Sequence, residues 1–403
     1  MKAVMYGAGN IGRGFIGALL SQAGYAVTFI DVNKSTVDAL NERHSYPLRI
    51  LSNDGFEDLE IKNVCAIDGN DKPLVAKAIA GADIMATAVG ANILKIIAPN
   101  IADGIRLRLE ISQTPLDILI CENLMDADQH LAGLIMENLT PKEVPLFKKQ
   151  IGLVEASIGR MVPVQTDALK DSDPLRVCVE RYRWLPVDKD AIKGDVPNIE
   201  GLVPYSPFGY YIKRKLFVHN MGHAFCAYLS SYTGYQYIWQ AVNDPDIYIL
   251  VKNAMLEGIQ AIAAEYSMSL EPLLLHIEDL LLRFTNQALG DTCVRVGADP
   301  TRKLGPSDRL VGAARLCESQ GILCPYISVA IAAAVHRYLY DAELPQSTKG
   351  AQDVLISLSG IGDREPLFEN VMKAYALFAE GTRPAQLRCM IERESSRRIS
   401  DVI

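Results

Sequence analysis

The residues best suited to chemistry stand close together in the second half of the chain. Lys215, Asn220 and His223 lie within one predicted helix. Because an α-helix turns by roughly 100° per residue, Asn220 is expected about 140° from Lys215, with His223 between them. All three side chains can then face one cleft.

This set of side chains would suit the removal of a proton from an alcohol. A buried lysine can act as the base, because desolvation disfavours its ammonium form and lowers its pKa. A side-chain amide can donate to the developing alkoxide, and a histidine can orient the lysine or relay the proton. No metal is required. The spacing alone leaves a second interpretation open, in which the three residues are solvated or capping groups.

Glycines at the start of the chain match a dinucleotide-binding pattern. Gly7, Gly9 and Gly12 form G-x-G-x-x-G between a predicted strand over 2–6 and a predicted helix over 11–23. The first glycine permits a tight turn, the second lets the backbone approach a pyrophosphate, and the third lets the helix pack close to the sheet. The helix N-terminus then offers N–H groups and partial positive charge to the phosphates.

An acidic residue makes this pattern more specific than a glycine-rich turn of another α/β domain. Asp31 closes a second predicted strand, over 26–30, where its carboxylate can accept from both ribose hydroxyls. The same charge would repel a 2′-phosphate, so NAD is favoured over NADP. Thr87–Gly90 would place small residues beside the cofactor, although they also suit an ordinary turn. The predicted cofactor-binding residues are Gly7, Gly9, Asn10, Ile11, Gly12, Asp31, Thr87 and Val89.

The order of the predicted elements determines the expected fold. Apolar runs typical of strands recur at 83–89, 116–121 and 151–158, with helical patterns such as 92–102 and 124–138 between them. This alternation predicts a Rossmann-type α/β domain with a doubly wound parallel sheet. After about residue 208, long helical patterns replace the strands and predict a mostly α-helical C-terminal domain. These helices are 208–231, 234–243, 246–266, 271–284, 323–340 and 364–380.

The predicted domain boundary lies where glycines and prolines cluster, near residues 190–200. We therefore expect an NAD-binding domain over 1–195 and a helical substrate domain over 196–403. Two domains also suit a chain of 403 residues.

The composition argues against several classes of partner. The net charge of −8 disfavours nucleic acids and anionic membranes, which bind basic surfaces. The longest apolar stretch, near 321–335, contains Pro325 and is too short for a membrane span. The eight cysteines form no C-x-x-C pair and indicate buried, reduced thiols. We therefore expect a cytoplasmic protein that is a monomer or a weak homo-oligomer.

Motifs spread in order over most of the chain resemble those of one enzyme family. The chain is similar to the mannitol-1-phosphate 5-dehydrogenases among the polyol-specific long-chain dehydrogenases, and the pattern K-x(4)-N-x(2)-H is specific to that group. The resemblance implies that Lys215 is the general base and that His223 supports it. It also implies that Asn123 and Asn220 hold the reacting oxygen and that no metal takes part. The motifs are Gly7–Gly17, Asp31–Asn33, Arg43–Tyr46, Thr87–Gly90, Cys121–Asn123, Arg214–Phe217, Asn220–His223, Arg295–Gly297, Arg302–Leu304 and Asp308–Leu310.

Asn123 has a second explanation when it is considered by itself. It follows the predicted strand 116–121 and would point toward the nicotinamide crevice. Asn is also a common N-cap, here for the helix predicted to start near 124. The resemblance favours the first role.

Four cations near residue 300 could bind a substrate phosphate through charge-assisted hydrogen bonds. A structural ion-pair network with neighbouring aspartates explains the same charge pattern. The cations are Arg295, Arg302, Lys303 and Arg309, and the aspartates are Asp291, Asp299 and Asp308.

Two positions depart from the family pattern and bear on the substrate. This chain has Ala298 where the family often has an arginine, and Gly159 where it typically has an aspartate, for which Glu155 is a candidate replacement. We therefore expect oxidation of a polyol phosphate, mannitol 1-phosphate or a close relative, to a ketose phosphate of the fructose 6-phosphate type. Two alternatives remain: a sugar-acid or hydroxy-acid dehydrogenase of the 6-phosphogluconate type, and a non-catalytic NAD-binding regulatory protein.

Overall fold

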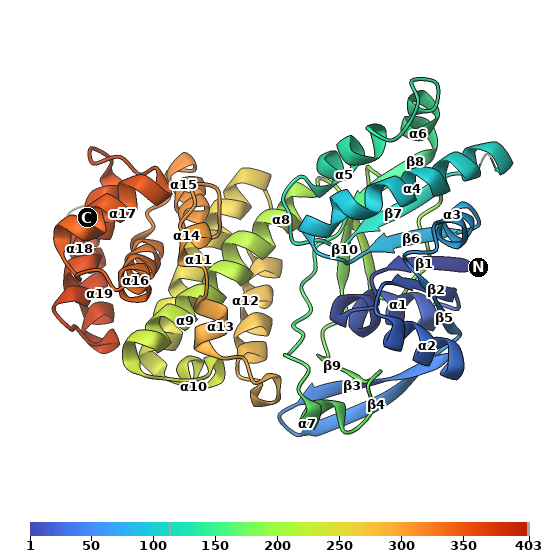
Figure 1. Cartoon of the computed structure of the whole chain (residues 1–403). Helices are drawn as coiled ribbons and strands as arrows, with labels where there is room; N and C mark the ends of the chain where they lie inside the picture. Colours follow the sequence, from blue (N-terminus) through green and yellow to red (C-terminus); the bar gives the residue numbers. More distant parts are fainter. Residues whose placement is uncertain (113, 401–403) are drawn as a thin grey trace. The chain divides into compact units, whose positions relative to one another are not determined.

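The chain forms two compact units in a computed structural model (Figure 1). The structure describes residues 1–112 and 114–400, with side chains through residue 393. The first unit is Met1–Tyr211 and the second begins at Ile212.

A six-stranded parallel sheet forms the centre of the first unit. Its strand order is β5-β2-β1-β6-β7-β8, and every neighbouring pair is parallel. Central strands such as β1 and β7 are buried on both faces, which explains their continuous apolar sequences. The predicted doubly wound α/β fold is confirmed. The strands are β1 (Lys2–Tyr6), β2 (Ala26–Asp31), β5 (Val64–Asp68), β6 (Ile84–Thr87), β7 (Leu116–Ile120) and β8 (Ile151–Glu155).

Helices cover both faces of this sheet (Figure 1). Alternate residues of β1 serve the two faces: Ala3 and Met5 face one core, and Val4 and Tyr6 face the other. The first core is closed by a π-helix η1 (Gly12–Ile16), α1 (Gly17–Gln22) and α2 (Lys34–Arg43). The second is closed by α3 (Lys72–Ala80), α4 (Ala91–Ile111), α5 (Ala127–Met136) and α6 (Val144–Gln150).

A smaller sheet that was not predicted from the sequence packs on the first core. The hairpin β3 (Ser45–Ser52) and β4 (Gly55–Lys62) is antiparallel, and β9 (Val177–Glu180) adds to β3 in parallel. The short strands β10 (Leu185–Asp188) and β11 (Leu202–Tyr205) pair with each other, and α7 (Asp167–Lys170) precedes β9.

The segment around the expected boundary at residue 195 belongs to the first unit in the structure. The carboxylate of Asp117 on β7 accepts from the amides of Lys193 and Gly194, at 2.8 and 3.1 Å. An added Cβ at Gly201 would lie 3.4 Å from Leu19, so this segment also packs on α1. The division into an NAD-binding domain over 1–195 and a substrate domain over 196–403 therefore stays a prediction.

The second unit is built from helices, as expected. The long helix α11 (Pro245–Tyr266) lies at its centre and packs against α9, α12, α15, α16 and α19. Among the described residues, α11 alone is long and apolar enough to cross a membrane, but 61% of its apolar window is buried in protein, as in a core helix. The helices are α8 (Gly209–Arg214), η2 (Lys215–Asn220), α9 (Met221–Thr233), α10 (Ile238–Val242), α12 (Glu271–Phe284), η3 (Gln287–Leu289), α13 (Cys293–Gly297), α14 (Pro300–Lys303), α15 (Val311–Ser319), α16 (Pro325–Asp341), α17 (Thr348–Ser359), α18 (Pro366–Ala379) and α19 (Pro384–Ser400).

The eight cysteines are free thiols. Most are buried, as the sequence suggested, while Cys65 is partly exposed and Cys389 is exposed.

Candidate active site

The glycine-rich loop follows β1 and passes close to the end of β6, the neighbouring strand in the sheet. Gly7 has φ 102°, and an added Cβ would lie 2.5 Å from the carbonyl oxygen of Ala88. At Gly12 an added Cβ would lie 1.9 Å from the carbonyl oxygen of Gly7. At Gly9 it would meet no protein atom within 4 Å. The protein itself therefore requires the first and third glycines, whereas the second leaves an open space beside the backbone.

The helix that follows this loop begins with an α turn, in which Arg13 donates its N–H to the carbonyl of Gly9 at 2.9 Å, and then continues with a π turn. Gly17 donates its N–H to the carbonyl of Gly12, five residues earlier, within η1. Asn10 is exposed and Ile11 half-buried just before η1. These residues stand at a helix N-terminus, where an anion is stabilised by free N–H groups and by the helix dipole.

Asp31 ends β2 beside this loop and is held there by backbone donors. Its Oδ2 accepts from the amide of Ala8 at 2.7 Å, and its Oδ1 accepts from the amide of Asn33 at 2.9 Å. The structure thus brings Asp31 to the glycine loop, as predicted from the sequence.

Thr87 and Val89 mark the same carboxyl edge of the sheet, at the end of β6. The hydroxyl of Thr87 is fully buried and has no hydrogen-bond partner within the described part of the chain. The amides of Val89 and Gly90 donate to the two carboxylate oxygens of Glu122, at 3.0 and 2.8 Å. Glu122 is a positioning residue that was not predicted from the sequence, although an acid directly after the buried strand β7 could have indicated it.

Asn123 follows Glu122 at this edge of the sheet, and its residue is exposed. It does not cap the next helix, because α5 begins at Ala127 and its N-cap is Asp126. The capping interpretation of Asn123 is therefore wrong.

Glu155 ends β8, paired in register with Ile120 of β7. Its Oε1 accepts from the amide of Ala127 at 2.6 Å, and burial raises the pKa of its carboxyl group. Glu155 therefore accepts a hydrogen bond from the first residue of α5.

Gly159, where the family pattern has an aspartate, lies against an aromatic ring. An added Cβ at Gly159 would lie 3.1 Å from Cε1 of Tyr182. A carboxylate side chain would need that ring to move.

In the second unit, Lys215 and Asn220 begin and end the π-helix η2. Met221 donates its N–H to the carbonyl of Leu216, five residues earlier. The i→i+5 hydrogen bond of a π turn brings residues five apart to nearly the same side of the helix. In an α-helix the same two residues would point about 140° apart. The predicted α-helical spacing is therefore wrong, and the actual turn places Lys215 and Asn220 on one side of the helix.

Two glycines of neighbouring helices make room for this turn around Phe217. An added Cβ at Gly258 of α11 would lie 2.9 Å from the Phe217 carbonyl oxygen. One at Gly312 of α15 would lie 2.8 Å from the Phe217 ring.

His223 lies one turn beyond η2 and is uncharged near neutral pH. Its ring stacks on Phe284, with centroids 4.7 Å apart. The pKa of His223 is lowered to about 3, mainly by burial and in addition by the charges of Arg295, Arg309 and Lys303. Its Nε2 is 3.2 Å from Oδ2 of Asp291 without forming a hydrogen bond. That carboxylate is already paired with Arg295, so it does not reverse the effect of burial.

His219 is a further residue of this region that was not predicted from the sequence. It is 6% exposed, and its ring centroid is 6.2 Å from that of His223. Burial lowers the pKa of His219 well below its usual value, and the charges of Arg283 and Lys215 act in the same direction. The spacing of four residues between the two histidines could have indicated the pair.

The four cations near residue 300 already have partners within the second unit. Arg295 pairs with Asp291, and Arg309 pairs with Asp308 at 2.8 Å. Arg302 pairs with Asp299 at 2.9 Å and with Asp308 at 3.4 Å.

The ammonium of Lys303 donates to the carbonyls of Val296, at 2.8 Å, and Ala298. The pKa of Lys303 is lowered to about 8, mainly by burial and in addition by the charges of Arg309 and Arg302, which outweigh Asp299 and Asp308. The ion-pair network expected as one alternative is thus present, and a phosphate would have to share these partners.

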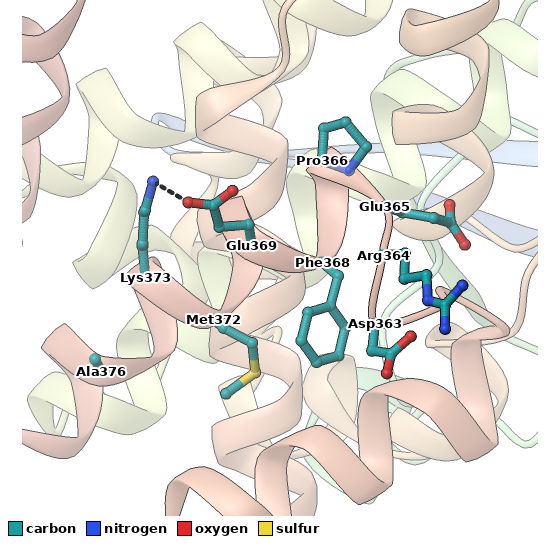
Figure 2. Close-up of a pocket in the computed structure, with 9 residues that line it drawn as sticks. All are labelled: Asp363, Arg364, Glu365, Pro366, Phe368, Glu369, Met372, Lys373 and Ala376. Carbon is teal, nitrogen blue, oxygen red and sulfur yellow. Dashed lines mark ion pairs between the residues drawn. The ribbon is translucent and has the colours of Figure 1, made fainter.

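One hollow of the second unit is lined by none of the predicted site residues. Within the described residues, no group of three or more His, Cys, Asp or Glu side chains is placed to hold a metal ion. The hollow, of about 660 Å³, lies where α18 begins, and Lys373 pairs with Glu369 at its rim at 2.8 Å (Figure 2). Its lining residues are Asp363, Arg364, Glu365, Pro366, Phe368, Glu369, Met372, Lys373 and Ala376.

Comparison with known proteins gives matches along nearly the whole chain. Residues 1–201 match the family model of the mannitol dehydrogenase Rossmann domain, and residues 208–375 match that of the mannitol dehydrogenase C-terminal domain. A mannitol-1-phosphate 5-dehydrogenase of Brevibacillus brevis is 41% identical over 92% of this chain and 96% of its own length. One of Thermoanaerobacter pseudethanolicus is 36% identical over 95% and 99%.

Two solved structures share the fold at low sequence identity. A D-sorbitol dehydrogenase in its substrate-free form matches with a TM-score of 0.81 and 14% identity, covering 96% of this chain and 95% of its own. The Pseudomonas fluorescens mannitol 2-dehydrogenase, in a ternary complex with NAD and D-mannitol, matches with a TM-score of 0.72 and 15% identity, covering 97% and 94%.

Proposed function

Because the chain belongs to the mannitol dehydrogenase family, we propose that it interconverts a polyol phosphate and a ketose phosphate with NAD as its cofactor. The expected substrate is mannitol 1-phosphate or a close relative, and the expected product is of the fructose 6-phosphate type. The observation that carries the catalytic part is the π turn that begins at Lys215 and ends at Asn220.

The first unit has features that fit NAD. The open space beside Gly9 would admit the pyrophosphate, and Asp31 would accept from the ribose hydroxyls. Asn10, Ile11, Thr87 and Val89 would line the rest of the site. When bound, NAD supplies the nicotinamide carbon that takes up or gives back a hydride.

The residues of η2 and its continuation would handle the hydroxyl group of the substrate. Lys215 takes the hydroxyl proton in the oxidative direction, as a general base. Asn220 and Asn123 donate to the oxygen as negative charge develops on it. His223, neutral because of its burial, supports Lys215. These roles need no metal.

The phosphate of the substrate would bind near the cations Arg295, Arg302, Lys303 and Arg309. Arg295, Lys303 and Arg309 lie within electrostatic reach of His223, since each lowers its pKa. Arg295 and Arg309 would bind the phosphate by exchanging part of their carboxylate contacts. Lys303 would donate to the phosphate by giving up part of its contacts with the carbonyls of Val296 and Ala298.

The remaining expectations fit this proposal. A cytoplasmic location goes with a phosphorylated metabolite and with free thiols. We keep the proposal of a monomer or weak homo-oligomer without nucleic-acid or membrane partners, on the basis of the net charge of −8.

A substrate panel tests the proposal directly. NADH formation is followed by absorbance with mannitol 1-phosphate, its epimers, free mannitol and 6-phosphogluconate. The highest kcat/KM is expected with a polyol phosphate. Preference for 6-phosphogluconate would instead identify a sugar-acid dehydrogenase. NAD binding without turnover on any of them would indicate a regulatory protein.

A further inference from the structure

A buried arginine lies directly beneath the glycine-rich loop. Arg13 is 8% exposed, and its Nε donates to the carbonyl oxygen of Ala8 at 2.6 Å. Its Nη1 donates to the carbonyl of Leu175. Removing a guanidinium from water is costly, and burial lowers the pKa of Arg13 accordingly. Placing this cation under two carbonyl groups therefore calls for an explanation beyond packing.

The backbone N–H and C=O groups of Ala8 both form hydrogen bonds with side chains. Its amide donates to Oδ2 of Asp31 at 2.7 Å, and its carbonyl accepts from Arg13. The Ala8–Gly9 peptide is planar and trans, so its C=O and N–H groups point in opposite directions. With the carbonyl turned inward to Arg13, the N–H of Gly9 must point the other way. An added Cβ shows that the surroundings of Gly9 are open.

The backbone of η1 is held independently of the guanidinium group. The hydroxyl of Tyr46 on β3 donates to the carbonyl of Arg13 at 2.6 Å. Nη1 of Arg160 donates to the carbonyl of Gly14 at 3.0 Å. An added Cβ at Gly14 would lie within 2.9 Å of Val177 and Val179, so β9 packs closely against this helix. The guanidinium group of Arg13 is therefore not needed to attach η1 to the domain.

We propose that Arg13 is a positioning residue that sets the Ala8–Gly9 peptide so that the Gly9 N–H faces the cofactor pyrophosphate. This inference rests on the proposed NAD site at the glycine loop. The buried positive charge adds to the potential of the helix N-terminus on the same anion. Without the guanidinium group, the Ala8 carbonyl is free to rotate, and its oxygen would then repel the phosphates.

The test compares ligands with and without the pyrophosphate. Dissociation constants of Arg13→Met and Arg13→Lys are measured for NADH and ADP-ribose by calorimetry, and for adenosine by competition. For Arg13→Met, NADH and ADP-ribose should bind about tenfold more weakly or worse, while adenosine binds as before. Arg13→Lys should restore part of the loss, because an ammonium can reach one carbonyl.

Tyr46→Phe is the matched control. It removes a hydrogen bond from the same helix without touching the Ala8 carbonyl. It should lower the melting temperature while leaving the ratio of NADH to adenosine affinity unchanged. A general loosening of the domain would instead change both variants in the same way.

Two results would overturn the inference. One is unchanged NADH binding in Arg13→Met. The other is an equal loss for NADH and adenosine, which would indicate a purely structural arginine. Gly9→Ala tests the NAD site itself. The added methyl group meets no protein atom, so it can weaken NADH binding only by contact with the cofactor. If Gly9→Ala also leaves NADH binding unchanged, the cofactor site lies elsewhere and both proposals fail.

Discussion

Lys215 and Asn220 are the first and last residues of one π-helical turn. An α-helix of the same sequence would direct them about 140° apart, whereas the i→i+5 geometry aligns them on one side. π turns are rare and recur at functional sites. The neighbouring glycines 258 and 312 leave room for this one around Phe217.

Replacing Lys215 should abolish most of the activity without affecting the cofactor. For Lys215→Ala we expect kcat to fall by about 10²- to 10⁴-fold, the usual contribution of a general base. The dissociation constant of NADH should not change. Lys213→Ala is the control, because Lys213 lies on the same helical segment but pairs with Glu265. Steady-state kinetics and NADH titration measure both, and retained turnover in Lys215→Ala would remove this residue from its role.

Asn220→Asp should impair the chemical step more than substrate binding. A carboxylate beside the reacting oxygen would repel the developing alkoxide, while the amide would donate to it. We expect kcat to fall by about 10²- to 10³-fold, as for other lost oxyanion donors. KM should change much less. A variant in which KM rises and kcat is unchanged would assign Asn220 to ground-state binding instead.

Asp31→Asn should shift cofactor preference toward NADP. The amide oxygen can still accept from one of the loop amides, so part of the contact to Ala8 and Asn33 persists. Removing the negative charge relieves repulsion of a 2′-phosphate. The ratio of kcat/KM for NADP to that for NAD should rise by about tenfold or more. Asp38→Asn, at an exposed ion pair with Lys34, should leave the ratio unchanged.

Arg295→Gln should distinguish phosphorylated from free substrates. If Arg295 binds phosphate, KM for mannitol 1-phosphate should rise about tenfold, while kinetics with free mannitol change little. Arg315→Gln serves as the control, because Arg315 pairs with Glu318 and Glu365 instead. An equal effect on both substrates would mean that Arg295 only maintains its ion pair with Asp291.

The buried histidines should make the folded state less stable in mild acid. Folding holds the pKa of His223 at about 3, whereas the unfolded chain takes up the proton near pH 6.5. The free energy of unfolding should therefore decrease as the pH falls from about 6.5 toward 3, and this effect should be absent above that range. Burial lowers the pKa values of His219 and His276 in the same direction.

Urea unfolding at pH 5 and pH 7.5 measures this dependence. His223→Gln should show a smaller difference between the two pH values than the unaltered protein. The same difference in both proteins would contradict the low pKa of His223.

The sequence by itself determined the elements whose rules are local. Gly7, Gly12 and Asp31 could be assigned from their spacing, because a strand–turn–helix unit places them by backbone geometry alone. Alternating strand and helix patterns likewise predicted the parallel sheet and the change to helices after residue 208. The alternative role of Asn123 as a cap was left open, because a cap and a site residue can both follow a strand.

Only the tertiary structure decided features that depend on contacts between distant segments. Arg13 meets Leu175 across 162 positions of the chain, and Glu122 meets Val89 across 33, so no local pattern reveals either contact. The π turn at Lys215 depends on packing against α11 and α15, which helical periodicity does not encode. The hairpin β3–β4 was missed for the same reason, since it packs against α1, α2 and the distant strand β9.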